Sequence, residues 1–188
     1  MEENGILETI SFPALEIISE NFDVARNPEL VSVSVPSLMF VDDQLGFQEN
    51  DKIVALSFPQ MVTIGDATEF ESNSRLESVS FPELKKIHYS RLEFVDNPVL
   101  NSIALPKLME VHMEVIVSNN PALEEIDFPK LATTYAVIVS YHDCELAFRV
   151  RSLVPHVVGG NECEPEIIRR RQTDGTICRF GDRRKPTA

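Results

Sequence analysis

The sequence predicts an all-β protein, a right-handed parallel β-solenoid of six turns with about 23 residues and three short strands per turn. The first observation is a pattern repeated six times, clearest in residues 76–84, Leu-Glu-Ser-Val-Ser-Phe-Pro-Glu-Leu. Its proline recurs in steps of 23, 23, 23, 24 and 23 residues, at Pro13, Pro36, Pro59, Pro82, Pro106 and Pro129. The second is that no segment of ten or more residues shows the 3.6-residue period of a helix.

Within each turn, the first strand is marked by apolar residues that alternate with small polar ones, the period of a strand with one buried face. The apolar positions six, three and one residues before the proline hold Leu7, Ile10 and Phe12 in the first turn and Leu76, Val79 and Phe81 in the fourth. Positions two and five residues after the proline, such as Leu84 and Ile87, predict a second inward-facing strand.

A third strand follows in each turn. Its predicted inward residues are Phe22 and Val24, Leu45 and Phe47, Thr68 and Phe70, Leu92 and Phe94, Val115 and Val117, and in the last turn Ile138. The single extra residue of the fourth turn must lie between Ile87 and Leu92, as a bulge or a longer corner. Three stacked parallel sheets result, climbing about 4.8 Å per turn and roughly 29 Å in all.

An asparagine stands nine residues before the proline of the next turn. The positions are Asn27, Asn50, Asn73, Asn97 and Asn120. Recurrence in one column predicts a structural asparagine ladder, in which each amide bonds to neighbouring turns and to buried corner backbone.

The repeat Asn-Pro-x-Leu-x-x-Ile-x-Phe-Pro-x-Leu-x-x-Ile resembles that of the receptor L domain, the leucine-rich single-stranded right-handed β-helix of insulin- and EGF-receptor ectodomains. Similar repeats are known in fungal cell-wall proteins and in BspA-like microbial surface proteins. The resemblance covers residues 6–143. It implies a cell-surface or extracellular role in which a sheet face binds a protein or cell-surface ligand without catalysis.

We expect three segments: a solenoid over residues 1–144, a C-terminal cap over 145–158 and a basic tail over 159–188. Residues 1–143 carry a net charge of −16, from 24 acidic and 8 basic residues, whereas 144–188 carry +3, from 6 and 9. A strongly acidic body disfavours nucleic acid as a partner. Of three cysteines, Cys144, Cys163 and Cys178, we expect Cys163 and Cys178 to form a disulfide, on proximity alone.

No run of about 18 apolar residues is present, so no membrane span is expected. The N-terminus lacks the basic start and apolar stretch of a secretory signal, which leaves a cytoplasmic location as the alternative to a surface one. No cofactor is expected from the sequence. The sequence does not determine the oligomeric state.

The outward positions of the first strand hold mostly small hydroxyl residues, which predict a flat docking face. The candidate residues are Thr9, Ser11, Ser32, Ser34, Ser57, Ser78, Ser80 and Ser102. The alternatives are a sheet covered by the protein's own tail, a face that simply meets water, or an ordered-water surface of the kind that ice-binding helices use.

Two further columns are candidates for metal binding. Glu20, Asp43 and Asp66 would stack one turn apart, where a cation such as calcium could relieve their repulsion, although three solvated carboxylates are the simpler interpretation. His88 and His112 fall in one column but lack a third ligand for zinc.

Catalysis finds little support, because the acidic residues are dispersed and no G-x-S-x-G, H-E-x-x-H or Gly-rich phosphate loop occurs. The sequence thus favours a non-catalytic recognition module. A carbohydrate-active β-helix enzyme and a structural surface protein are the alternatives.

Overall fold

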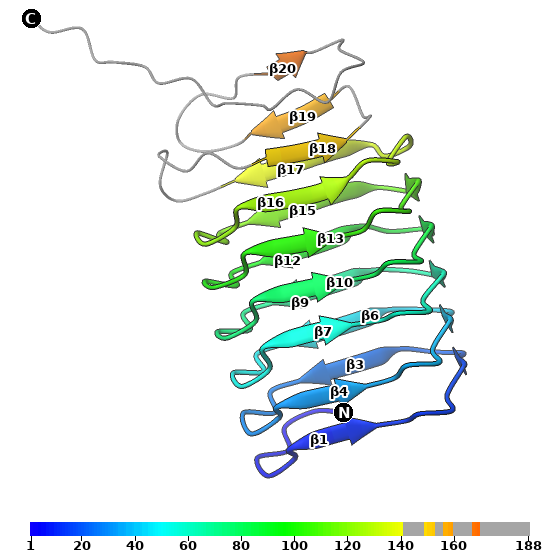
Figure 1. Cartoon of the computed structure of the whole chain (residues 1–188), viewed down its shortest axis with the longest axis vertical. Coiled ribbons are helices and arrows are strands. Elements are labelled where there is room, and N and C mark those ends of the chain that lie inside the picture. The colour runs from blue at the N-terminus through cyan, green and yellow to red at the C-terminus, as the bar shows by residue number, and fades with distance from the viewer. Residues whose placement is uncertain (141–148, 153–155, 160–166, 170–188) are drawn as a thin grey trace, which may run out of the picture.

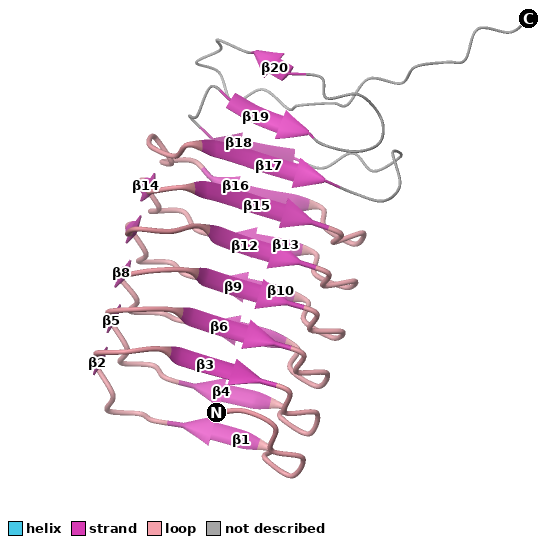
Figure 2. Cartoon of the chain, turned by 180° about the vertical axis from the view of Figure 1, so that it is seen from behind, coloured by secondary structure: helices cyan, strands magenta, loops and turns pink. Residues whose placement is uncertain are grey.

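The computed structural model describes residues 1–140, 149–152, 156–159 and 167–169 of the 188. These residues form twenty short strands, and no helix occurs among them. The chain coils upward through about six turns, each adding one strand to each of three faces (Figure 1). In Figure 1 the strands of the first sheet lie in front and point to the right, whereas those of the third sheet lie behind and point to the left. Figure 2 shows the third sheet from the back. A chain that follows this course while it climbs forms a right-handed coil. The predicted β-solenoid is confirmed.

The strands of the first sheet are β1 (Thr9–Ser11), β4 (Ser32–Ser34), β7 (Ala55–Ser57), β10 (Ser78–Ser80), β13 (Ser102–Ala104), β16 (Glu125–Phe128) and β18 (Arg149–Ser152). Those of the second sheet are β2 (Ile17–Ile18), β5 (Phe40–Val41), β8 (Thr63–Ile64), β11 (Lys86–Ile87) and β14 (Glu110–Val111). The third sheet holds β3 (Phe22–Ala25), β6 (Leu45–Gln48), β9 (Thr68–Glu71), β12 (Leu92–Val95), β15 (Glu114–Ser118), β17 (Ala136–Ser140), β19 (His156–Gly159) and β20 (Ile167–Arg169).

All pairs within the stack are parallel, and up to β15 they follow the register that the proline spacing predicts, for example Val79 beside Leu56 and Ile103. The ladder of the first sheet is interrupted between β4 and β7. At the C-terminal end, β18 and β19 extend the first and third sheets in the parallel sense, within residues expected to form a separate cap. Strand β20 then pairs antiparallel with β19.

The core consists of stacked columns of like side chains. Phe58 lies on Phe81 with ring centroids 4.7 Å apart, and Phe70 lies on Phe94 at 5.1 Å. These two columns meet edge to face, as at Phe70 and Phe81. Each turn therefore buries its apolar edges against the neighbouring turns, and contacts between adjacent repeats stabilise the stack.

The asparagine ladder is present, with all five predicted residues fully buried. In each copy the side-chain amide donates to backbone oxygens and the side-chain oxygen accepts the backbone N–H of the preceding ladder residue; Asn73, for instance, donates to the oxygens of Phe47 and Glu71 and accepts from Asn50. The residue before each ladder position has a positive φ, as at Ser72 with 55°, so the chain turns sharply there. The sequence analysis missed Asn4, which heads the ladder because its N–H donates to the Asn27 side-chain oxygen.

Two details of the last three turns follow from the register. The extra residue lies between Ile87 and Leu92 as predicted, because these pair with Ile64 and Thr68, which are one residue closer together. The inward assignment of Ile138 was wrong, since Val137 pairs with Val115 and Val139 with Val117, and both valines are buried. The inward positions of this strand are therefore one residue away from the predicted one.

Candidate binding surface

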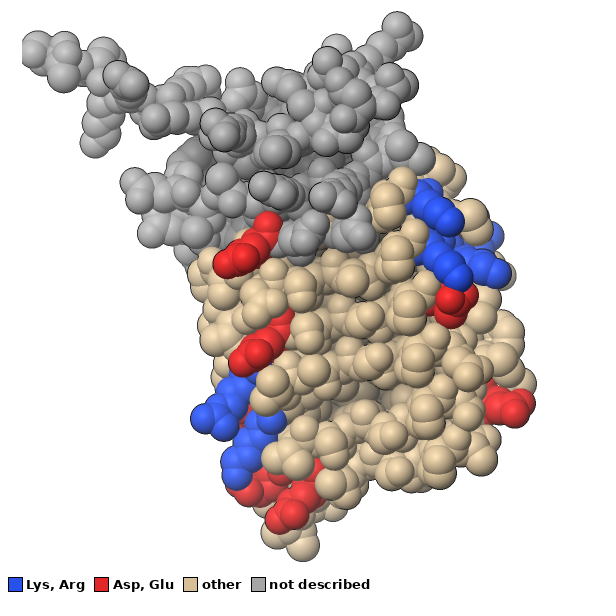
Figure 3. Space-filling view, viewed as in Figure 1, with Lys and Arg blue, Asp and Glu red and all other residues tan. Residues whose placement is uncertain are grey.

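The outward side of the first sheet carries small, uncharged side chains over its first five strands. Ten side chains point outward from these strands, and we call them the uncharged face: Thr9, Ser11, Ser32, Ser34, Ala55, Ser57, Ser78, Ser80, Ser102 and Ala104. All ten are exposed or half-buried. Figure 3 looks onto this sheet and shows Lys, Arg, Asp and Glu only along its flanks in the described part.

This arrangement places every predicted face residue where the sequence analysis expected it. Parallel pairing aligns the columns directly, as in Ser78 between Ala55 and Ser102. The uncharged run ends at β16, where Glu125 and Asp127 occupy the corresponding register positions.

The carboxylate column proposed for a metal is not a site in the structure. Among the described residues, no group of three or more His, Cys, Asp or Glu side chains is arranged to hold a metal ion, so Glu20, Asp43 and Asp66 do not converge. Glu20 and Asp43 are exposed at the corner between the second and third sheets, on successive turns. The predicted pair of Cys163 and Cys178 lies outside the described residues, as does Cys144.

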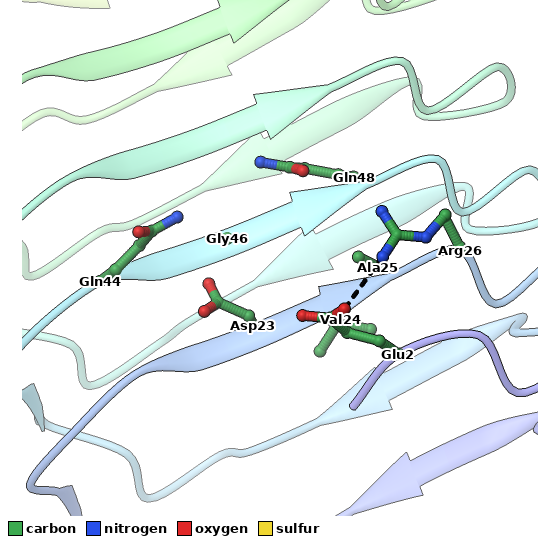
Figure 4. Close-up of a pocket in the computed structure, with 8 residues that line it drawn as sticks. All are labelled: Glu2, Asp23, Val24, Ala25, Arg26, Gln44, Gly46 and Gln48. Carbon is green, nitrogen blue, oxygen red and sulfur yellow. Dashed lines mark hydrogen bonds and ion pairs between the residues drawn. The ribbon is translucent and has the colours of Figure 1, made fainter.

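The outward side of the third sheet carries a hollow that the sequence analysis did not predict (Figure 4). It has a volume of about 150 Å³ and lies over β3 and β6, lined by Glu2, Asp23, Val24, Ala25, Arg26, Gln44, Gly46 and Gln48. The hollow depends on the absence of a side chain at Gly46, because a Cβ there would lie 2.6 Å from Oδ1 of Asp23. That buried oxygen has no hydrogen-bond partner among the described residues.

Two carboxylates on this side of the third sheet hold their protons more tightly than usual. Burial raises the pKa of Asp23 above its ordinary value of 3.8, with the charges of Glu2 and Asp43 acting in the same direction. Burial and the neighbouring Glu93 raise the pKa of Glu69 above 4.5. Glu69 nevertheless accepts hydrogen bonds at 3.1 Å from the side-chain amides of Gln44 and Gln48.

We expect Asp23→Asn and Glu69→Gln each to raise the melting temperature at neutral pH. With folded pKa values above the unfolded ones, the folded protein binds more protons, so stability falls as pH rises through that window and the ionised groups cost stability above it. Thermal melts between mildly acidic and neutral pH check this, and the variants should show a smaller loss of stability on going to neutral pH.

The matched control is Glu83→Gln, because the hydrogen bond from Lys107 lowers the pKa of Glu83. Removing that charge should not stabilise the protein at neutral pH. Lower melting temperatures for both Asp23→Asn and Glu69→Gln would show that these charges are not destabilising.

Comparison of the chain with protein-family models, with curated proteins and with solved structures found no match. No helix long and apolar enough to cross a membrane occurs among the described residues. The fold defines the class, which is a β-solenoid repeat protein.

Proposed function

We propose that this chain is a non-catalytic recognition module that binds a protein or cell-surface ligand through the uncharged face. The observation that carries the proposal is the composition of that face. A quarter of the chain's residues are charged, and yet none of ten outward positions on five adjacent strands is. Charged residues are depleted at the centres of protein interfaces, because removing a charge from water is costly.

The dimensions of the face suit the centre of an interface. Five strands spaced about 4.8 Å apart and three residues long cover roughly 20 Å by 10 Å. A standard interface buries about 800 Å² on each partner, so the partner would also contact the charged flanks seen in Figure 3. Those flanks would then form the polar rim.

The resemblance of the repeats to the receptor L domain supports the same function and an extracellular or cell-surface location. The implied role in that family is binding through a sheet face. Nothing in the proposal requires a cofactor.

Affinity capture with the full chain as bait, followed by mass spectrometry, tests the proposal when variants are run in parallel. Ser57→Glu on the uncharged face should lose the protein or glycan that the unaltered chain captures. Thr63→Glu adds the same charge to the same turn but on the second sheet, and should retain it. Equal capture by all three proteins would count against the uncharged face.

A carbohydrate-active enzyme is the second candidate, and the raised pKa values of Asp23 and Glu69 favour it. Such sites use carboxylates tuned as acids or bases. The hollow of about 150 Å³ is smaller than the roughly 300–1,000 Å³ of usual ligand pockets, which favours recognition instead. Release of reducing ends from a polysaccharide panel, lost in Asp23→Asn but kept in Ser57→Glu, would reverse this preference.

A further inference from the structure

The corner between the second and third sheets presents exposed aromatic side chains in its C-terminal turns. Residues at this corner, in turns two to six, form what we call the corner ridge: Asp42, Asp43, Asp66, His88, Tyr89, His112, Met113 and Tyr135. Tyr89 is 77% exposed and Tyr135 80% exposed. Large aromatic side chains that face water at one corner, two turns apart, are unusual in a protein whose phenylalanine columns are mostly packed inside.

The fold itself does not require Tyr89 at this place. It belongs to the four-residue corner between Ile87 and Leu92, the only position in the described turns where the chain holds one residue more than the regular repeat. Its φ of 59° is left-handed, and the other positive-φ residues all precede a ladder asparagine, whereas Tyr89 does not. The insertion therefore displays a tyrosine that the regular turn would not carry.

The aromatic residues lie close enough to form one platform. The Tyr89 ring centroid is 5.7 Å from that of His88 in the same corner and 6.4 Å from that of His112 in the next turn. Tyr135 lies two turns from Tyr89, which is about 10 Å at the spacing of paired strands. A bound chain running along the solenoid axis could contact both tyrosines.

The N-terminal turns of the corner ridge carry acidic residues. Asp42 and Asp43 are exposed and Asp66 is half-buried. The ion pairs among the described residues involve other carboxylates, such as Glu2, Glu29, Glu83, Glu93 and Glu110. The charge of the ridge carboxylates is thus open to a partner.

We propose that the corner ridge binds an extended basic peptide segment of a partner protein. Lysine or arginine side chains would pair with Asp42, Asp43 and Asp66 and stack on the faces of Tyr89 and Tyr135, since cations are attracted to aromatic rings. Charge complementarity selects this partner, because the acidic carboxylates repel nucleic acid and anionic lipid surfaces. A neutral glycan can donate hydroxyl hydrogen bonds to the carboxylates, but it carries no positive charge for them to attract.

Fluorescence anisotropy with the full chain tests the proposal, using labelled peptides of alternating Arg-Ser, Lys-Ser and Glu-Ser sequence. The two basic peptides should bind, more weakly as salt rises, and the acidic peptide should not. Tyr89→Leu and Tyr135→Leu should each raise the dissociation constant of the Arg-Ser peptide about two- to fivefold, the effect of an exposed cation–π contact, whereas Tyr89→Phe should keep most of the binding.

Asp66→Asn should weaken binding and reduce its salt dependence, and the matched control is Glu124→Gln, an exposed carboxylate at a different corner. Equal weakening by both would show general attraction to an acidic protein and overturn the proposal. Binding of a neutral cello-oligosaccharide that depends on Tyr89, without binding of either basic peptide, would overturn it in favour of a glycan site. Because Ser57 is on a different sheet, Ser57→Glu should leave basic-peptide binding unchanged.

Discussion

Phe81→Asp should unfold the solenoid at room temperature. The Phe81 ring is fully buried, stacked on Phe58 and edge-on to Phe70. Losing a buried Phe side chain costs about 3–5 kcal/mol, and a buried carboxylate without a partner adds several more. Together these approach or exceed the roughly 5–15 kcal/mol by which domains are usually stable.

Far-ultraviolet circular dichroism and a thermal melt check this expectation. The control is Ser80→Asp, which introduces an aspartate at the adjacent position, on the outward side of β10. It should leave the spectrum native and the melting temperature within a few degrees. A native spectrum and melt for Phe81→Asp would refute the inward assignment of the phenylalanine column.

Asn73→Ala should have the second largest effect, a loss of about 3–6 kcal/mol of stability. It would leave the Asn50 N–H and the Phe47 oxygen without their partner in the middle of the ladder. Each buried polar group left unsatisfied costs about 1–3 kcal/mol, and the hydrogen bond to the Glu71 oxygen is lost as well. Aspartate would not rescue the position, because it lacks both amide donors and brings a charge.

Denaturant unfolding gives the free-energy difference directly. Asn101→Ala provides the comparison, since Asn101 is an exposed asparagine on a neighbouring turn and its replacement should change stability by no more than about 0.5 kcal/mol. Equal effects of the two substitutions would mean that the ladder amides are not important for stability.

Much of the fold could be predicted because one period governs the buried side chains. A column such as Leu30 to Leu123 is buried by the neighbouring turns, so the spacing of apolar residues predicts both the strand and its inward face. The prediction failed where the period fades. At Ile138 a run of four apolar residues, 136–139, hides the alternation, and pairing with Val115 and Val117 decides which side chains face inward.

The candidate surfaces were predicted unevenly for a similar reason. Outward positions of the first sheet follow directly from alternation, so the uncharged face could be listed from the sequence. The hollow could not, because it depends on Gly46 lying directly beside Asp23 and on Met1–Glu3 running along the edge of β3. Tyr89 was located as part of an insertion, but its exposure follows from a backbone conformation that spacing does not specify.

The dissociation constant of a captured partner, measured with purified proteins, tests the central claim most directly. Ser57→Glu and Ser80→Glu, each on the uncharged face, should raise it at least about tenfold, the equivalent of 1.4 kcal/mol, because a charge would be buried without a partner. Thr63→Glu on the second sheet should leave it within about twofold. If the uncharged-face variants bind as tightly as the unaltered chain, or if Thr63→Glu weakens binding as much as they do, recognition through the uncharged face is contradicted.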